Sequence, residues 1–324
     1  MKKGTIIALI ISAVLILLGI LMCAASYPQL EMLADREEHY RTETYTYDIN
    51  EINKIRIDDI DSCITVVSTS EPIISMEWNE SDRNYYNINV SDRGEFIAER
   101  RTDYKWYDFE SMFDLFSGYD TVYVKVYEGY TGDIELGTIN GSISISVDES
   151  TVSGPMWYRE IDDRHVMLTN DDARFTFGSV DIHSVNGEIY LYNTVVNDSA
   201  VLETTNGDIT LANVAPRHIY VGTTNGEIDV YDLDLISLAA RLPLIDSYAE
   251  YSKFSTVNGD IDMVLRGDMY DYIFDIFTVN GDVENGRPNV KDANSNASDT
   301  SKHEAQVPLT VSTVNGDIEI DYLG

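Results

Sequence analysis

Carboxylates recur at one fixed place in a short motif, two residues after the Asn of an Asn-Gly pair, and of all the side chains here they are the best suited to chemistry. The motif, which also has Thr or Ser two residues before the Asn, occurs seven times, and six copies carry the acid, with Ser142 in the remaining copy. If the copies stack at the usual strand spacing of about 4.8 Å, the acids form a ladder along one edge. Such a ladder either binds calcium weakly through hard oxygen ligands or is an edge screened by solvent and salt. The six acids are Glu188, Asp208, Glu227, Asp260, Asp282 and Asp317.

The same acids are poorly arranged for catalysis. A catalytic site on stacked repeats needs two converging carboxylates, or calcium-bound carboxylates with a basic partner. Here each acid occupies an equivalent position in its repeat, which is typical of a structural role, and basic residues are scarce. The sequence also contains no G-x-S-x-G, P-loop or H-E-x-x-H motif. We therefore expect no catalytic residue, and a calcium-dependent polysaccharide-active enzyme is the least favoured function.

Cysteine and histidine offer no metal site or disulfide framework. The two cysteines, Cys23 and Cys63, form no C-x-x-C pair, and the five histidines are scattered without the spacing of zinc ligands. No cofactor is expected beyond the calcium that the acidic ladder could bind.

The charge balance limits the partners. Lys and Arg number 22 against 56 Asp and Glu, which gives a net charge of −34. A chain this acidic repels phosphate backbones, so nucleic acid is excluded as a partner. The 44% of hydrophobic residues can supply a substantial core, which argues against a chain that is disordered throughout.

Short strands are expected to position the acids. Counting from the motif Asn, position −2 is always Thr or Ser, position +3 is always Ile or Val, and apolar residues recur at −6 and −4. This alternation with period two predicts strands that meet at an Asn-Gly corner, where Gly would take a positive φ and Asn would tolerate the left-handed region. The corners are Asn140-Gly141, Asn186-Gly187, Asn206-Gly207, Asn225-Gly226, Asn258-Gly259, Asn280-Gly281 and Asn315-Gly316.

Two arrangements fit these strands. Asn-Gly is the strongest short signal for a β-hairpin, so a meander of hairpins is one alternative. In a hairpin, however, the valine that often stands at position −1 would share a face with the acid at +2. The corners are 46, 20, 19, 33, 22 and 35 residues apart, which indicates an underlying period of about 20 with insertions. We therefore predict an all-β parallel β-solenoid with coils of about 20 residues over 131–324.

The insertions and the preceding region have their own expected structures. A degenerate coil is expected near 166–177, a short helix within 233–251, and a disordered loop over 285–308, which is rich in Asn, Ser, Asp and Lys. Residues 51–130 are expected to form an N-terminal β region. Its aromatic, acidic loop at 104–119 is either a cap on the solenoid end or a partner-binding loop, and the cap is favoured.

The amino terminus predicts a membrane anchor. Residues 5–26 carry no charge, and as a helix these 22 residues would span about 33 Å. Two lysines precede the run and acids follow it, so residues 1–4 are expected in the cytoplasm and the bulk of the chain outside. A signal cleaved after this run is the less favoured alternative, because the apolar stretch is long for a cleavable signal. Residues 27–50 are expected to be a linker.

The repeats T-T-N-G-D-I-T-L and S-T-V-N-G-D-I-D-M resemble those of the bacterial toast-rack family, the adhesin-like β-strand-repeat domains. The similarity extends from Ile52 to Leu323 and includes D-D-I-D-S-C-I-T-V-V and the strand D-T-V-Y-V-K-V-Y. The resemblance implies a parallel β-helix on envelope proteins with adhesive or envelope-stress roles. It brings no catalytic residues.

These observations together predict a membrane-anchored, extracytoplasmic β-solenoid that acts as a non-enzymatic, adhesin-like binding protein. Its ligand would be a protein or glycan at the cell envelope. The alternative is an envelope-stress sensor or regulatory domain. Because so little of the chain would lie in the cytoplasm, such a sensor would have to work through a membrane partner.

Overall fold

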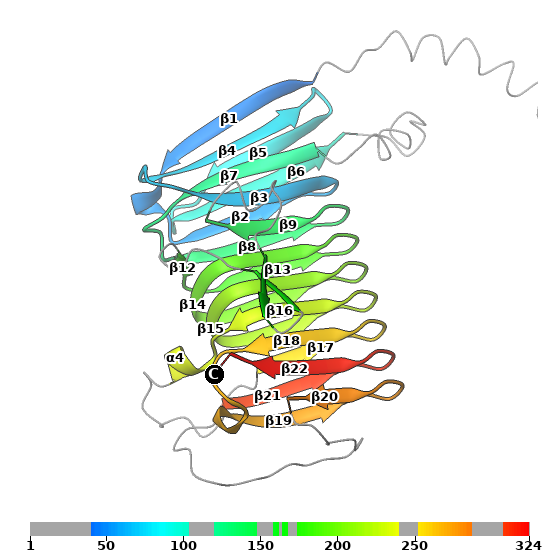
Figure 1. Ribbon diagram of the computed structural model, residues 1–324. Helices are drawn as coiled ribbons and strands as arrows, with labels where there is room; N and C mark the ends of the chain where they lie inside the picture. The colour runs from blue at the N-terminus through cyan, green and yellow to red at the C-terminus, as the bar shows by residue number, and fades with distance from the viewer. Residues whose placement is uncertain are drawn as a thin grey trace, which may run out of the picture.

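The computed structural model describes residues 40–103, 120–147, 158–161, 164–167, 174–239, 252–286 and 307–323. In these residues the fold is all-β, a curled, largely parallel sheet of solenoid-like coils (Figure 1). The expected anchor at 5–26, the aromatic loop at 104–119 and most of the loop at 285–308 lie outside them. No helix within the described residues is long and apolar enough to cross a membrane.

Each repeat contributes one strand before its corner and one after it. The pre-corner strands are β8 (Asp133–Thr138), β13 (Val180–Ser184), the second halves of β14 (Ile189–Glu203) and β15 (Ile209–Gly222), β17 (Ser252–Ser255), β19 (Tyr272–Phe277) and β21 (Val307–Ser312). The post-corner strands are β9 (Ile143–Ser146), the first halves of β14 and β15, β16 (Ile228–Leu233), β18 (Ile261–Leu265), β20 (Val283–Asn285) and β22 (Ile318–Tyr322).

Neighbouring repeats stack in parallel with equivalent residues side by side. The isoleucine at position +3 illustrates the register, because Ile189 pairs with Ile209, Ile209 with Ile228, and Ile228 with Ile261. A meander would instead pair the two strands that flank one corner in antiparallel fashion. The strands before and after a corner pair with other repeats, so the coil alternative describes the repeats correctly and the hairpin alternative does not.

The interior of the stack is apolar because alternate residues of each strand point inward. The residue at position +3 is fully or almost fully buried in every coil except the outermost coil at the carboxyl end of the stack, where Val283 is half-buried. Position +5 adds a second row along the stack. Its members, from coil to coil, are Ile145, Leu191, Leu211, Val230, Met263, Ile320 and finally the half-buried Asn285.

The coils do not stack in chain order at the carboxyl end. β22 pairs with β18 on one side and with β20 on the other, and β21 lies in the same way between β17 and β19. In Figure 1 the red carboxy-terminal strands accordingly lie between the coil of β17 and β18 and the orange coil of β19 and β20. The acidic ladder therefore ends in the order Asp260, Asp317, Asp282, which differs from the order in the sequence.

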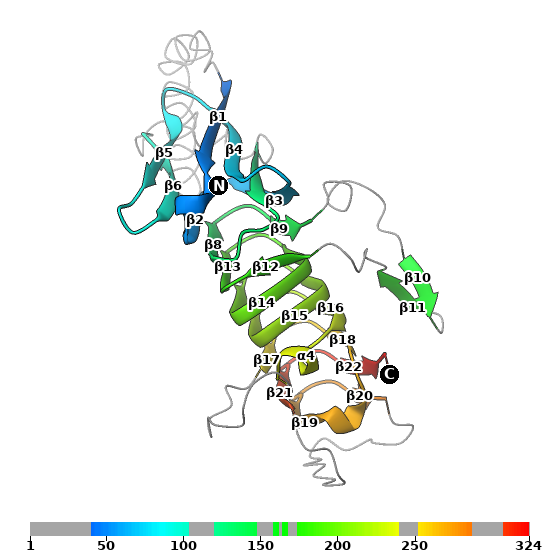
Figure 2. The same ribbon diagram turned by 90° about the vertical axis from the view of Figure 1, so that its left-hand side faces the viewer.

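The amino-terminal region closes the other end of the stack (Figure 2). β2 pairs with β6 and β8, whereas β3 pairs with β7 and β9, so β2 and β3 form a coil that precedes the Asn140 corner. β1 pairs with β4 in antiparallel fashion and β5 with β6 likewise. The strands are β1 (Arg41–Asp48), β2 (Lys54–Asp58), β3 (Ser62–Thr69), β4 (Ile73–Glu80), β5 (Asn84–Val90), β6 (Glu95–Thr102) and β7 (Asp120–Tyr127).

Residues 41–48 of the expected linker are in fact the strand β1. Their sequence R-T-E-T-Y-T-Y-D alternates, and every second residue from Glu43 is half-buried. Tyr45 and Tyr47 pack against the core, which is why this polar segment is held in the sheet.

The insertions differ from one of the expectations and confirm another. The expected coil near 166–177 is absent from the described residues, because Asn186 lies directly on Asn140. In its place β10 (Tyr158–Ile161) and β11 (Arg164–Met167) form a separate antiparallel pair, and β12 (Phe175–Phe177) joins β14. The short helix expected within 233–251 is confirmed as the single turn α4 (Ile236–Ala239).

Candidate functional site

The asparagines of the corners form a continuous ladder of side-chain amides. Each Nδ2 donates a hydrogen bond to the Oδ1 of the asparagine in the neighbouring coil, with N–O distances of 2.7–2.8 Å. Asn140 donates in the same way to Asp61 of the preceding coil, at 2.7 Å. From one end to the other the ladder comprises Asp61, Asn140, Asn186, Asn206, Asn225, Asn258, Asn315 and Asn280.

The hydroxyl group at position −2 makes a second contact between coils. Each Thr or Ser hydroxyl donates to the backbone carbonyl one residue after the neighbouring corner asparagine or its equivalent Asp61, at 2.9–3.2 Å. These hydroxyls are buried, and a buried hydroxyl that lacks a partner is costly. The threonine or serine is therefore required by the adjacent coil rather than by its own strand.

The corner glycines are required for close approach, and the expected positive φ is wrong. In the described residues, positive φ occurs only at Gly94, Gly267, Gly286 and three non-glycine residues, none of them at one of the seven repeat corners. A Cβ at Gly226 would instead lie 2.0 Å from the carbonyl oxygen of Gly207 in the adjacent coil. The other corners are alike, with a Cβ 1.9–2.2 Å from the neighbouring carbonyl oxygen at Gly141, Gly187, Gly207, Gly259, Gly281 and Gly316.

The acids at position +2 are also bonded from coil to coil. Asp208 Oδ1 accepts the backbone N–H of Glu227 at 2.8 Å, and Asp317 and Asp282 donate their N–H groups in the same way to Asp260 and Asp317, each at 2.7 Å. A backbone N–H that points at a carboxylate stabilises its charge. This contact offsets part of the repulsion within the ladder, which sequence reasoning had left to salt or calcium.

All six ladder acids are exposed, and the structure brings them into one row as the sequence predicted. Among the described residues, no three His, Cys, Asp or Glu side chains converge closely enough to hold a metal ion. The calcium ladder stays a prediction.

A second row of carboxylates runs beside the first, two residues further along each strand. Asp229 of β16 lies next to Asp262 of β18, followed by Glu319 of β22 and Glu284 of β20. We call the two rows together the acidic face. No Lys or Arg occurs in any of the six post-corner segments that carry these acids, of which 188–192 is the first in the chain and 317–322 is the last.

The acidic face perturbs its own ionisation at Asp229. Burial raises the pKa of this carboxyl group to about 6, and the negative charges of Asp262, Glu227 and Asp208 add to the effect. The Asp229 side chain is half-buried. A cation bound here would relieve a repulsion that already exists in the free protein.

The pre-corner strands present a mixed surface on the opposite flank. His183 lies between Asp181 and Glu203, with nitrogen–oxygen distances of 2.5 and 3.3 Å. Lys54 of β2 contacts Glu135 at 2.5 Å. Carboxylates on this flank therefore have basic neighbours.

Sequence reasoning missed a second row of corners seven residues after the motif Asn. Asn193, Asn213 and Asp232 have positive φ values of 50°, 54° and 60°, and they bend the post-corner strands away from the first corner. Asn213 Nδ2 donates to Asn193 Oδ1 at 2.8 Å, and Arg266 binds the Asp232 carboxylate. The signal was present in the sequence, because Asn or Asp tolerates the left-handed region and stands at +7 in three successive repeats.

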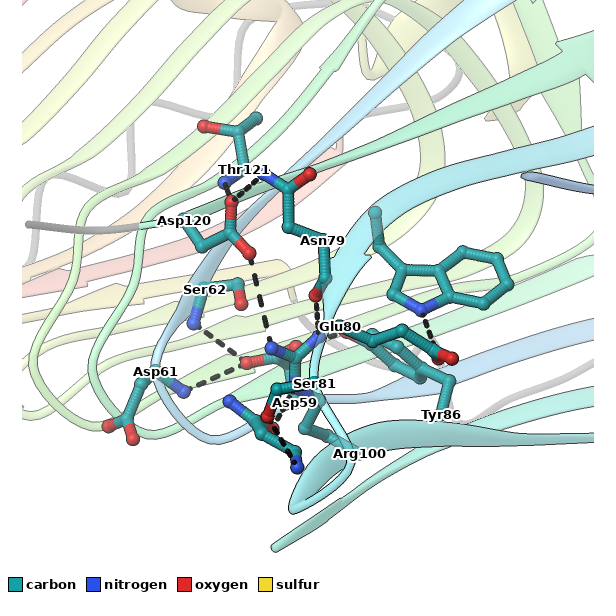
Figure 3. A network of polar contacts seen from close by, with 12 residues as sticks. Asp59, Asp61, Ser62, Asn79, Glu80, Ser81, Tyr86, Arg100, Asp120 and Thr121 are labelled. Carbon is teal, nitrogen blue, oxygen red and sulfur yellow. Dashed lines mark hydrogen bonds and ion pairs between the residues drawn. The ribbon is translucent and has the colours of Figure 1, made fainter. Parts of the chain in front are cut away.

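A buried polar network fixes the first coil (Figure 3). Asp59 Oδ1 accepts the backbone N–H groups of residues 60–62 at 2.6–2.8 Å, and Oδ2 accepts the Tyr86 hydroxyl. The Arg100 guanidinium lies 5.0 Å from the Tyr86 ring centroid and 3.9 Å from the Asp120 carboxylate. The Asp59 carboxylate is thus held by four donors. We interpret the network as a structural clamp on the Asp61 corner.

No curated protein matches the chain. A candidate adhesin from Bacteroides fragilis NCTC 9343 is 13% identical, with a TM-score of 0.44 over 86% of this chain and 97% of that one. A candidate adhesin from Parabacteroides distasonis ATCC 8503 is 10% identical, with a TM-score of 0.41 over 87% and 98%. A candidate cell adhesion protein from Clostridium sporogenes ATCC 15579 is 9% identical, with a TM-score of 0.32 over 88% and 100%.

The family model described as Toastrack DUF4097 matches residues 52–321. This span contains all seven Asn-Gly corners and the Asp61 corner, so the resemblance expected from the motif is confirmed. The chain belongs to the Toastrack DUF4097 family.

Proposed function

We propose that this protein is a membrane-anchored, extracytoplasmic binding protein with an adhesin-like role, and that its acidic face binds cationic groups on a protein or glycan at the cell envelope. The observation that carries the proposal is the acidic face itself, with two rows of carboxylates in register and no basic residue among them. A rigid repeat of like charges favours ligands that carry several positive charges, because linked contacts raise avidity.

The corner motif supports binding rather than catalysis. Its hydroxyl and amide groups are committed to the neighbouring coils. The carboxylates of Asp208, Asp260 and Asp317 likewise accept backbone N–H groups of the neighbouring coil. A catalytic group needs to be free to exchange protons or attack a substrate, and these groups are not.

Binding of poly-L-lysine, with poly-L-glutamate as the negative control, tests the acidic face. The variant Asp229→Asn, Asp262→Asn, Glu319→Gln removes three charges from the face. At about 0.2–1 kcal/mol for each exposed ion pair, the affinity for poly-L-lysine should fall roughly 3- to 150-fold.

A matched variant separates the face from net charge alone. Asp181→Asn, Glu203→Gln, Asp275→Asn removes three carboxylates from the pre-corner flank and should leave the affinity within about twofold of the parent, because distant charges are screened. Equal losses in the two variants would contradict a role for the face.

The anchor is tested in intact cells. The uncharged run at 5–26 should hold the chain in the membrane with residues 40–324 outside. Protease added to spheroplasts should then digest the β-structure. Protection of that part, or its release into the medium, would contradict the proposed topology.

Crosslinking in the same cells distinguishes the adhesin-like role from the sensor. Recovery of an external protein or glycan supports the adhesin-like role. Recovery of a membrane kinase or transporter instead would favour the sensor alternative.

A further inference from the structure

The last three coils carry almost the same corner sequence and yet stack out of chain order. The segments are S-T-V-N-G-D-I at 255–261, F-T-V-N-G-D-V at 277–283 and S-T-V-N-G-D-I at 312–318. The third segment lies between the first two, as the bridges of Asn258 to Asn315 and of Asn280 to Asn315 show. We call the position between β17–β18 and β19–β20 the inner slot.

The corner contacts do not distinguish the two stacking orders. Asn315 donates its amide to Asn258 at 2.7 Å, and Asn280 donates to Asn315 at 2.8 Å. The threonine hydroxyls of both coils make the same 3.0 Å contact with the neighbouring glycine carbonyl. The Asn280 coil could therefore form the same bonds directly on the Asn258 coil.

Interior residues do distinguish the two orders. β21 and β22 place Leu309, Val311, Ile318 and Ile320 inward, each almost fully buried. At the position equivalent to Ile320, β20 has Asn285. In the outer place this amide is only half-buried and accepts the Tyr322 hydroxyl at 2.5 Å. In the inner slot it would lie between Met263 and Ile320, where an unpaired amide is unfavourable by about 5- to 150-fold in the stacking equilibrium.

During synthesis the coils emerge in chain order, which differs from the order in which they stack. The Asn280 coil precedes the Asn315 coil in the chain, so it reaches the free edge of β17 and β18 first. The connector at 287–306 is long enough for either order, since 20 extended residues reach up to about 70 Å. The coil that arrives first is thus the one less suited to the inner slot.

We propose that the Asn280 coil first stacks on the Asn258 coil and is then displaced outward by the carboxy-terminal coil, which takes the inner slot. The slot is an exchange site for strand pairs of the sequence T-V-N-G-D, and Asn285 sets which coil remains in it. Replacing this asparagine with an apolar residue should let the two coils compete.

Cysteine pairs at the exposed valines of position −1 report the order. Val257 and Val314 lie in adjacent coils, since the N–H of Asn315 bonds to the Val257 carbonyl at 2.9 Å. Val257 and Val279 are two coils apart, about 9.6 Å, which exceeds the reach of a disulfide. The full-length chain with Cys23→Ser and Cys63→Ser is the background. In it, Val257→Cys with Val314→Cys should crosslink under mild oxidation, and Val257→Cys with Val279→Cys should not.

Two changes should produce the second crosslink. Asn285→Leu in the full-length chain should raise the Val257–Val279 crosslink from background to at least one-tenth of the molecules, whereas the surface change Glu284→Gln should not. A chain ending after residue 306 should form the same crosslink in most molecules. The proposal is overturned if Asn285→Leu leaves the crosslink at background, or if the shortened chain fails to form it, whether or not β19 and β20 remain folded.

Discussion

Replacing Asp229 with Asn should stabilise the protein at neutral pH. The carboxyl group is half-buried beside Asp262 and Glu227, and its pKa rises from 3.8 in the unfolded chain to about 6 in the fold. A group with a raised pKa favours folding only while it is protonated. Its contribution is therefore complete below about pH 4 and is lost as the pH rises through 6.

The magnitude follows from the shift in pKa. A difference of about 2 units corresponds to about 3 kcal/mol. Because the side chain is only partly buried, screening by solvent should reduce this to about 1–1.5 kcal/mol. Asparagine has nearly the same shape and no charge, so the variant should recover this free energy of unfolding at pH 7.5 and almost none at pH 3.0.

Thermal melts at the two pH values test the reasoning. At about 2–4 °C per kcal/mol, Asp229→Asn should raise the melting temperature by about 2–6 °C at pH 7.5 and by less than about 1 °C at pH 3.0. Both values avoid the isoelectric point of about 4.2, where solubility is lowest. Asp92→Asn, on an exposed turn, is the control and should change neither melt. A variant no more stable than the parent at pH 7.5, or equally stabilised at both pH values, would refute the assigned repulsion.

Three further predictions concern the corners. Gly226→Ala should cost about 3 kcal/mol or more in unfolding free energy, because its Cβ would meet the Gly207 carbonyl. The control Gly222→Ala, whose Cβ meets only the Tyr220 ring at 3.3 Å, should cost less than about 1 kcal/mol. Equal costs in denaturant titrations would contradict the close-approach argument. Asn225→Ala breaks two amide contacts and should cost about 1–2 kcal/mol, and Asn280→Ala breaks one and should cost about half as much, so a larger cost at Asn280 would exclude a simple ladder. Calcium at matched ionic strength should raise the melting temperature above that in sodium if the ladder binds it, and identical midpoints would reduce the ladder to a screened edge.

The sequence was sufficient for the coil and its corner because the motif repeats with a period that only stacked strands explain. Thr256, Asn258 and Gly259 were identified as corner residues, but the reasons for the glycine were misjudged. A local motif suggests a local cause such as φ, whereas the clash at Gly259 involves Gly226, which is 33 residues away. The carbonyl that imposes glycine becomes visible only when the coils are stacked.

Two other features of the fold could not be predicted from the sequence, and the reasons differ. The order of the last coils could not be predicted from corners that are nearly identical, because the deciding residue is Asn285, outside the motif. The Asp61 corner was hidden because Asp and Ser replace Asn and Gly there, although Ile64 keeps the spacing at position +3. By contrast, the acids at +2 were predicted to lie in one row, and they do.

The coil-to-coil contacts of the corner have a consequence for how such proteins change in length. Every coil brings its own hydroxyl and amide donors on one side and the matching carbonyl and amide acceptors on the other, so each junction is nearly a copy of the one before it. Duplication of one unit of about 20 residues in the gene would insert a coil that finds complementary neighbours at once. The molecule would grow by about 4.8 Å without any new interface having to evolve. Loss of one unit would shorten it by the same step, so the distance between its two ends can be adjusted by repeat number alone.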